Sequence, residues 1–494
     1  MLPPVRLECT ARKLCGFSTR CSKGLLSLYN VVMRLGGFIL TTATIGVTSC
    51  GGQESATQVP ARDYVAEYNA LMESAQPPGE NAWPVLLSAS QRIKAIEDEV
   101  KAASGLEDAQ VNLTWFTMRP DTPAEFDDAG RGREVVERSM QEGLFEELHK
   151  ASEATRLLSP LDLPDGLLRS HKWDFASVRH ALLALLSASY LSFEADDSDR
   201  AVGYLCAGLR LTSMISGQGV WIDRLLANSV RVYFLEEVRL ALIERSLSVE
   251  QMRRLLDCLE RAPAAPLART FKAEHLALRQ GLEVAYADDS RFTKEQLIDE
   301  TRLVNPGAGI APDELAPLDA VLAVLDESFE QWVRDSDRIA VERESTDEVN
   351  RARAEQLGPA YTHASSTLAV ASMFFRDSDV ERAHDAGTRV MLAIELFVAE
   401  NDQLPELLDD LIPQCLSALP RDPITGGSLI YRPNDGRMWR QDYLLYVVGL
   451  DGEDNGGNVE RWMQDVPLTN AKHGAGYDYV FNLPRFIQPR KGSR

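Results

Sequence analysis

Apolar side chains recur at intervals of three or four residues through most of the chain after residue 80. This spacing gathers them on one face of an α-helix and predicts amphipathic helices packed around a core. The clearest such stretches are 83–100, 174–189, 201–214, 221–243 and 312–357. The sequence therefore predicts a mainly α fold, with a helical bundle or helical hairpins over residues 81–376.

Short polar motifs predict where several helices begin. Each motif places a Ser or Thr three residues before a Glu or Gln, and this spacing lets the two side chains cap the first backbone amides of a helix. The motifs are Thr122–Glu125, Ser248–Gln251, Thr293–Gln296 and Ser378–Glu381. The acidic stretch 195–199 separates two of the predicted helices and predicts the turn of a helical hairpin.

The apolar pattern changes near residue 377. A helix predicted from Ser378 to about Glu400 is followed by a short helical stretch, 406–412, and then by apolar runs that are typical of strands. These runs cover 428–432, 442–448 and 477–482. We therefore expect residues 377–494 to form a small α+β module that follows the helical body.

The N-terminal region has the layout of an export signal. A mostly apolar stretch, Leu35 to Thr48, follows Met33-Arg34 and ends just before Cys50-Gly-Gly. A basic residue before a short apolar run is characteristic of a signal peptide. Residues 51–80 begin with small and polar residues and are predicted to form a tether.

The residues before Cys50, Val47-Thr48-Ser49, resemble the lipobox of bacterial lipoproteins. The resemblance implies that Cys50 is lipidated and that residues 1–50 are a leader. The alternative is an uncleaved membrane anchor over Leu25–Thr48, in which the charge of Arg34 would cost about 2.5–3.5 kcal/mol at mid-membrane. The preceding basic residues either form an unusually long leader or lie before a true start at Met33.

Charge and cysteine content narrow the classes of partner. The net charge is −22, and residues 1–34 hold six basic residues against one acidic residue, so the remaining chain is more acidic still. A phosphate backbone repels such a surface, so we expect no nucleic-acid partner. The expected partners are the membrane, through the lipid on Cys50, and other envelope proteins. Cys206 and Cys258 are predicted to be free buried thiols, and the sequence contains no CxxC pair.

Familiar catalytic motifs do not occur in the sequence. It contains no HExxH, GxSxG, P-loop or Rossmann glycine fingerprint, and no two of its seven histidines are four residues apart. His180 and His275 lie in predicted helices, where a histidine is more often an ordinary side chain than a base. Glu236 and Glu237 point about 100° apart on a helix and form no ready acid–base pair. We expect a non-enzymatic protein; the alternative is a hydrolase-like envelope enzyme with a site between helices.

One acidic loop, Val448–Gly457, indicates specific chemistry. It follows a strand-like run and holds three carboxylates and an amide between Asp451 and Asn455, among several glycines. A tightly turning loop rich in oxygen atoms suits a hard cation such as Ca²⁺. An EF-hand does not fit, because Trp462 stands at loop position 12, where a bidentate Glu is needed. The alternative is a plain solvated turn.

The order of the C-terminal segments resembles the periplasmic domain of the major pseudopilin of bacterial type II secretion. The resemblance covers about residues 378–480. The matching segments are Ala399–Pro405, Leu419–Pro423, Gly426, Leu429–Arg432 and Asp442–Gly452. It implies a structural calcium ion bound by Asp451, with Asp454, Asn455 or a later aspartate such as Asp478 completing the ligands.

Together these features predict a membrane-anchored envelope lipoprotein that faces the periplasm or the exterior. A helical scaffold would carry a pseudopilin-like module that calcium stabilises and that contacts partners. The pseudopilin family's N-terminal helix, with its prepilin cleavage site, does not directly precede this module. A component of the secretion system itself is an alternative, but the missing helix counts against it. We therefore do not expect the chain to polymerise as a pseudopilus.

Overall fold

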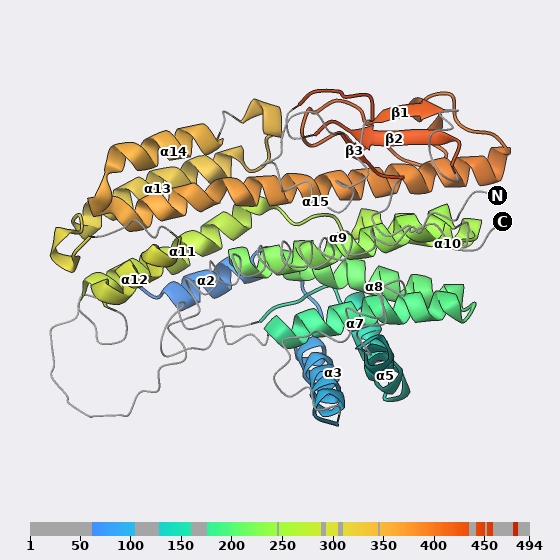
Figure 1. Ribbon diagram of the computed structural model, residues 1–494, viewed down its shortest axis with the longest axis horizontal. Helices are drawn as coiled ribbons and strands as arrows, with labels where there is room; N and C mark the ends of the chain where they lie inside the picture. The colour runs from blue at the N-terminus through green and yellow to red at the C-terminus, as the bar shows by residue number, and fades with distance from the viewer. Residues whose placement is uncertain are drawn as a thin grey trace, which may run out of the picture.

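The computed structural model describes residues 62–103, 128–159, 175–244, 247–287, 293–304, 310–343, 346–433, 441–449, 452–457 and 478–482. Within them the chain is mainly helical, with a small antiparallel sheet near the C-terminus (Figure 1), and this confirms the predicted fold class. Cys50, Asp451 and the predicted cap Thr122–Glu125 lie outside the described residues. Among the helices described, none is long and apolar enough to cross a membrane.

The helices follow the predicted apolar stretches closely. They are α2 (Tyr64–Glu73), α3 (Trp83–Ala103), α5 (Asp128–Gln141), α6 (Leu144–Glu153), α7 (Phe175–Glu194), α8 (Ser198–Ser216), α9 (Trp221–Ile243), α10 (Val249–Arg261), α11 (Leu267–Tyr286), α12 (Lys294–Val304), α13 (Leu318–Asp335), α14 (Thr346–Leu357) and α15 (Thr362–Asn401). The 3₁₀ turns are η3 (Pro312–Glu314), η4 (Ala340–Glu342), η5 (Pro359–Tyr361) and η6 (Leu408–Leu411). The strands are β1 (Ile430–Pro433), β2 (Tyr443–Val447) and β3 (Tyr479–Val480).

Two of the predicted caps begin helices as expected. In the first, Ser248 accepts a hydrogen bond from the amide of Gln251, whose side chain accepts one in return from the amide of Ser248. Thr293 and Gln296 make the same reciprocal pair before α12. Both caps satisfy backbone amides that the first helical turn leaves without intrahelical partners.

The prediction that a helix begins at Ser378–Glu381 is wrong. These residues lie inside α15, which begins at Thr362 and runs for 40 residues. Ser378 and Glu381 are buried and contact Arg224 of α9. Their polar side chains are therefore partners of a buried arginine and do not cap a helix. The expected boundary between residues 376 and 377 falls within this helix, and α2 lies within the expected tether at 51–80. The short helical stretch expected at 406–412 is the single turn η6.

Helix α15 belongs both to the helical body and to the C-terminal module. In Figure 1 it crosses the molecule, with α13 and α14 beside its first part and the sheet beside its last part. The largest apolar cluster combines side chains of α3 and α5–α10 with Val390 of α15, Leu445 of β2 and Phe481 after β3. The body and the module therefore share one hydrophobic core rather than having separate ones.

The sheet is an antiparallel meander in the order β1–β2–β3. Tyr431 pairs with Leu445, and Tyr446 pairs with Val480. Because side chains alternate along a strand, Leu445 enters the main core while Tyr446 joins a smaller cluster on the other face. Gly387 allows the close packing of α15 beneath the sheet, since a Cβ atom there would lie 2.4 Å from the ring of Phe481.

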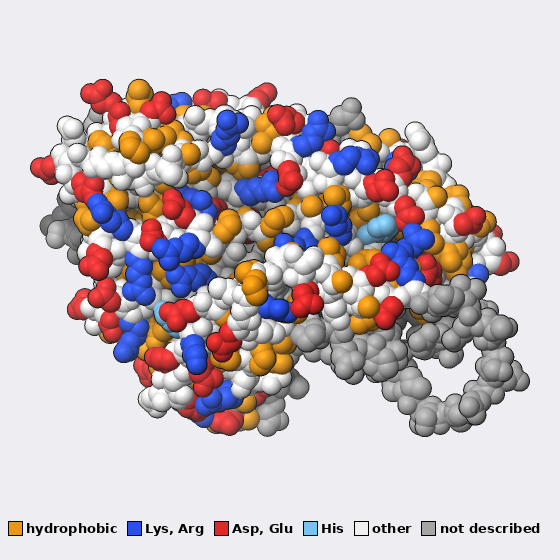
Figure 2. Space-filling view, turned by 180° about the vertical axis from the view of Figure 1, so that it is seen from behind, with side chains coloured by type: hydrophobic (Ala, Val, Ile, Leu, Met, Phe, Trp, Pro, Cys, Tyr) orange, Lys and Arg blue, Asp and Glu red, His pale blue; other side chains and the backbone are white. Residues whose placement is uncertain are grey.

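A second apolar cluster lies between the start of α9, helices α11 and α13, and the first part of α15. Its centre is aromatic: the rings of Trp221 and Phe374 stack with their centroids 3.8 Å apart, and Phe271 and Trp332 pack beside them. Outside these cores, acidic and basic side chains are interspersed over most of the face seen in Figure 2. On that face the net acidity of the chain is dispersed, not gathered into one patch.

Candidate functional site

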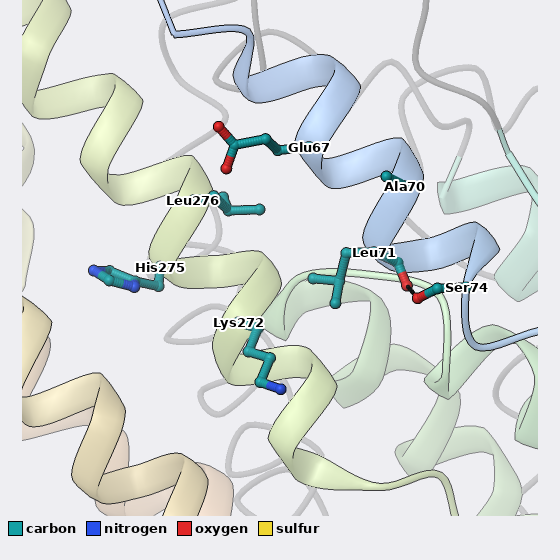
Figure 3. A pocket seen from close by; sticks show the side chains of 7 residues that line it. All are labelled: Glu67, Ala70, Leu71, Ser74, Lys272, His275 and Leu276. Atoms are coloured by element: carbon teal, nitrogen blue, oxygen red, sulfur yellow. Dashed lines mark hydrogen bonds between the residues drawn. The ribbon is translucent and has the colours of Figure 1, made fainter.

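A surface hollow of about 460 Å³ lies between α2 and α11. Its lining residues are Glu67, Ala70, Leu71, Ser74, Lys272, His275 and Leu276 (Figure 3). Amphipathic packing of the two helices sets their spacing, because Tyr64 and Tyr68 of α2 are buried against α11. If an envelope enzyme had its site in this hollow, acid–base groups would have to converge there.

The polar groups of the hollow point to other partners. His275 Nε2 lies 2.7 Å from Asp326 Oδ1, and the ring stacks on Phe329 of α13. Figure 3 shows this ring on the side of α11 away from Leu71. Burial lowers the pKa of His275, and Glu67 pairs with Arg62 at 2.7 Å. The hollow therefore brings no acid–base pair together at a common point, and it gives the enzyme hypothesis no support.

A buried carboxylate links α3 to α7. Glu97 is 0% exposed and pairs with His180 of α7 through Nδ1, while Lys101 Nζ lies 3.0 Å from its other oxygen. The sequence predicted that His180 was an ordinary helical side chain. It could not reveal the pairing with Glu97, because the two residues lie 83 positions apart. The arrangement orients the imidazole of His180 and ties α3 to α7.

Three arginines of α9 face α15 and form the most unusual feature of the described chain. Arg224, Arg231 and Arg239 are each at most 1% exposed, and we call them the arginine ladder. They stand seven and eight residues apart, about two helical turns, so they lie along one face of the helix. Lysine and arginine side chains are almost never fully buried without partners, so the ladder requires acceptors on the facing helix.

Polar residues of α15 supply most of those acceptors. Arg224 Nη2 donates to Ser378 Oγ at 3.2 Å and lies 3.4 Å from Glu381 Oε2. At the other end, Arg239 Nη1 donates to Thr388 Oγ1 at 2.6 Å. The partner numbers rise together along the two helices, which shows that α9 and α15 run in the same direction where they touch.

Arg231, in the middle of the ladder, connects four helices. Its Nη2 atom lies 2.7 Å from Asp385 Oδ1, and its Nε atom lies 3.6 Å from Glu381 Oε1. It also donates to the carbonyl oxygens of Leu209 in α8 and Ala262 at the end of α10. A cation beside the last carbonyls of α10 also matches the negative end of that helix dipole.

Burial sets the electrostatics of the ladder. It raises the pKa of Glu381, while the nearby guanidinium groups of Arg224 and Arg231 lower it. It lowers the pKa of Arg224, and Glu381 opposes that change. Nearby, Asp379 pairs with Arg343, and burial raises the pKa of Asp379 to about 6. These groups are buried between helices, where they fasten the fold.

A second group of buried carboxylates lies at the N-terminus of α9. Asp223 Oδ2 accepts from the amide of Val220 at 3.1 Å, and Glu274 Oε2 of α11 accepts from the amide of Trp221 at 3.1 Å. Negative groups are favourable at this end of a helix. Burial raises the pKa of Glu274 to about 7, and burial together with the charge of Glu274 raises that of Asp223. This pair differs from the ladder because a helix end, not a guanidinium, faces the carboxylates.

The acidic loop brings two of the predicted calcium ligands together. Asp454 Oδ1 accepts from the amide of Gly456 at 2.8 Å, and Asp478 Oδ2 accepts from the next amide, that of Gly457, at 2.7 Å. Asn455 instead donates to the carbonyl of Glu453. The predicted ligand Asp451 lies outside the described residues, so its position relative to the other three is not defined.

Donors already surround Asp454. The hydroxyl of Tyr446 donates to Oδ1 at 2.8 Å, and Arg432 Nη2 lies 3.8 Å from Oδ2. Hydrogen bonds from Gly456 and Tyr446 lower the pKa of Asp454. A calcium ion at this carboxylate would share it with the hydroxyl and would lie near a guanidinium, which weakens the fit of Asp454 to calcium. Among the described residues, no group of three or more His, Cys, Asp or Glu side chains is placed to hold a metal ion.

Comparisons with known proteins give no relative for this chain: no family model, no curated protein and no solved structure matches it. Its function must therefore be argued from its own residues.

The arginine ladder is the feature that analysis of the sequence missed. Its signal was present, since three arginines interrupt the apolar run 221–243 at helical spacing. Arginine on an amphipathic helix normally indicates the solvent face, so the pattern alone does not identify burial. The polar motif Ser378–Glu381 was the matching signal on α15 and was interpreted as a cap. Only their contact in the folded chain shows that the two patterns belong together.

Proposed function

We propose that this chain is an exported, lipid-anchored and non-enzymatic scaffold, which presents a small C-terminal module to other envelope proteins. The observation that carries the proposal is α15, a single helix that lies in the body and also beneath the sheet. A hinge needs a few residues that absorb backbone rotation. An unbroken helix fastened by buried arginines offers no such residues between the body and the module, which favours rigid presentation over movement.

The lipid anchor is the first part of the proposal to test. The support for it is the apolar stretch that ends at Cys50. In a bacterial host fed an alkyne analogue of palmitate, we expect the full chain to carry the label and to sediment with membranes. Cys50→Ala should lose both properties, whereas the matched control Cys415→Ala should keep them. Unlabelled wild-type chain, or a membrane fraction unchanged by Cys50→Ala, would contradict the anchor.

Contact with partners is the second part. Leu407 beside η6 is 64% exposed and belongs to the module, and Val349 of α14 is 50% exposed and belongs to the body. We expect a photo-crosslinking amino acid at position 407 to capture discrete envelope proteins in living cells. The same probe at position 349 is the matched control and should capture few. Equal patterns at both positions would show that the module is not the presenting surface.

The same scaffold limits the role of the pseudopilin-like module. Helices α9, α10, α12 and α14 of the same chain pack along α15. Another subunit could reach these faces only after those helices separated, and separation of α9 would leave the arginine ladder unpaired at high cost. The proposal is therefore a borrowed module on a scaffold and not a polymerising subunit.

Calcium binding is the third part. The support for it is the convergence of Asp454 and Asp478 on neighbouring amides, while Arg432 opposes it. A ligand at about a hundred times its dissociation constant stabilises the folded state by about 2.7 kcal/mol. We therefore expect calcium to raise the Tm of the full chain above its value in excess chelator, and Asp478→Asn to abolish the difference. Identical melting in both buffers would reduce the loop to a solvated turn.

A further inference from the structure

Two buried cysteines face each other between α8 and α10. Cys258 Sγ lies 3.4 Å from the backbone oxygen of Cys206, and Cys206 Sγ lies 4.0 Å from the backbone oxygen of Arg254. Each thiol thus points to a carbonyl of the opposite helix, so both thiols lie in the interface between α8 and α10. The two residues are 52 positions apart, which is why no CxxC spacing revealed them.

The surroundings of this pair favour thiol chemistry. A side-chain hydrogen bond with Cys206 lowers the pKa of Cys258, and the guanidinium groups of Arg210 and Arg231 lower it further. The same hydrogen bond, together with burial, raises the pKa of Cys206. Burial opposes the change at Cys258, but the direction makes Cys258 the member of the pair that gives up its proton more readily. A thiolate is the nucleophile of disulfide exchange.

We propose that Cys206 and Cys258 are a disulfide-forming pair that ties α8 to α10 when the chain is in an oxidising compartment. When α8 and α10 open enough to admit a disulfide oxidant, such as oxidised glutathione, the Cys258 thiolate attacks one sulfur of the oxidant and releases the other as a thiolate. The Cys206 sulfur then gives up its proton and attacks the Cys258 sulfur of the mixed disulfide, and the bound half of the oxidant leaves as a thiolate. The two cysteines lose two protons and two electrons, and the oxidant is reduced to two thiols.

The cross-link would close a long loop of the chain, which restricts the unfolded state. It would also lie beside Arg231, so it would fix α8 and α10 on two sides of the arginine ladder. Its formation in cells rests on the proposed export, because such bonds persist mainly in oxidising compartments. Its geometry does not depend on export, and so the two can be tested separately.

The direct test is peptide mapping of the full chain after equilibration in glutathione redox buffers. The folded protein, and protein refolded in the same buffers, are alkylated and cut with trypsin. We expect peptide 201–210 to be joined to peptide 255–261 in oxidising buffer, with a mass two hydrogens below their sum. The peptide with Cys415 should carry the alkyl group in every buffer. Reductant should return the first two peptides to the alkylated form and lower the Tm.

Matched variants make the outcome decisive. Cys206→Ala should abolish the joined peptides and leave Cys258 either alkylated or joined to glutathione, while Cys415→Ala should leave the cross-link unchanged. Absence of the joined peptides in both the folded and the refolded wild-type chain would overturn the proposal. Joined peptides in the buffer, but alkylated thiols in chain trapped from cells, would uphold the pair and count against export instead.

Discussion

The α9–α15 interface and the acidic loop use the same chemistry in opposite surroundings. In the interface, Arg231 lies 2.7 Å from Asp385, and the arginine is 0% exposed. In the loop, Arg432 lies 3.8 Å from Asp454, and both side chains are more than a third exposed. The sequence draws attention to the loop, because its carboxylates are crowded together. Because its charges are buried, the interface is nevertheless the region where replacement of one side chain should change the free energy of unfolding most.

The physical reason is the cost of leaving one charge without its partner. Water screens an exposed charge whose partner is removed, and exposed pairs typically contribute only about 0.2–1 kcal/mol. A buried carboxylate cannot be rehydrated without opening the core, so breaking a buried pair costs about 3–5 kcal/mol. Glu274 is a third case, since it is buried at a helix end and its pKa is raised.

The largest effect should follow removal of the central arginine. We expect Arg231→Met to lower the free energy of unfolding by about 3–5 kcal/mol, because Glu381 and Asp385 stay buried without their shared cation. Urea unfolding followed by circular dichroism measures this loss.

A compensated variant separates charge from packing. Arg231→Met combined with Asp385→Leu removes the carboxylate nearest Arg231 and leaves Glu381 paired with Arg224. It should recover part of the lost stability, since apolar groups often replace buried ion pairs without loss. If the double variant were no more stable than Arg231→Met, electrostatics would not explain the interface.

A smaller effect, with a clear pH dependence, should follow Glu274→Gln. Burial raises the pKa of Glu274 from 4.5 to about 7, so the folded state favours the protonated acid. Relative to the variant, wild-type stability should fall as the pH rises from about 4.5 to 7 and stay lower above that. At about 1.4 kcal/mol per pKa unit, the difference is about 3 kcal/mol.

Unfolding at pH 5 and at pH 8 tests this prediction. Glu274→Gln should be close to wild type at pH 5 and more stable at pH 8. Asp223→Asn, a change in the neighbouring acid, should shift stability in the same direction. If both variants had the same free energy of unfolding as wild type at both pH values, the two carboxylates would be solvated in the folded protein and the prediction would be wrong.

The smallest effect should come from the exposed loop. We expect Arg432→Met to change the free energy of unfolding by less than about 1 kcal/mol, and the change should shrink further as salt is added. The same urea measurement in low and high salt checks it, with Arg231→Met as the buried counterpart. A loss as large as that of Arg231→Met would remove the contrast between the two regions.

Much of the fold could be predicted from the sequence, because local periodicity determines where amphipathic helices lie. The stretch 221–243 coincides with α9, and the runs 428–432 and 442–448 overlap β1 and β2. The strand predicted at 477–482 contains the short β3. These elements depend on residues close together in the chain, so their positions can be predicted from the sequence without the tertiary structure.

The start of α15 and the ladder could not be predicted, because both depend on distant residues. Ser378 and Glu381 form a capping motif by local rules, and a contact 154 or more positions away decides their role. The same holds for Cys206 and Cys258, whose closeness arises from the packing of α8 on α10. Of the expected metal ligands, Asp454 and Asp478 accept hydrogen bonds from two neighbouring backbone amides, and Asn455 donates to a backbone carbonyl.

The central claim is that α15 makes the helical body and the C-terminal module one cooperative unit. Hydrogen exchange read by mass spectrometry over increasing urea tests it most directly, because it reports the opening of each part of the helix separately. The account predicts that residues 364–376 and 384–398 lose protection together, at the same urea concentration, and that Arg231→Met shifts both equally. Loss of protection in 384–398 well before 364–376 would contradict it, since the module would then unfold on its own.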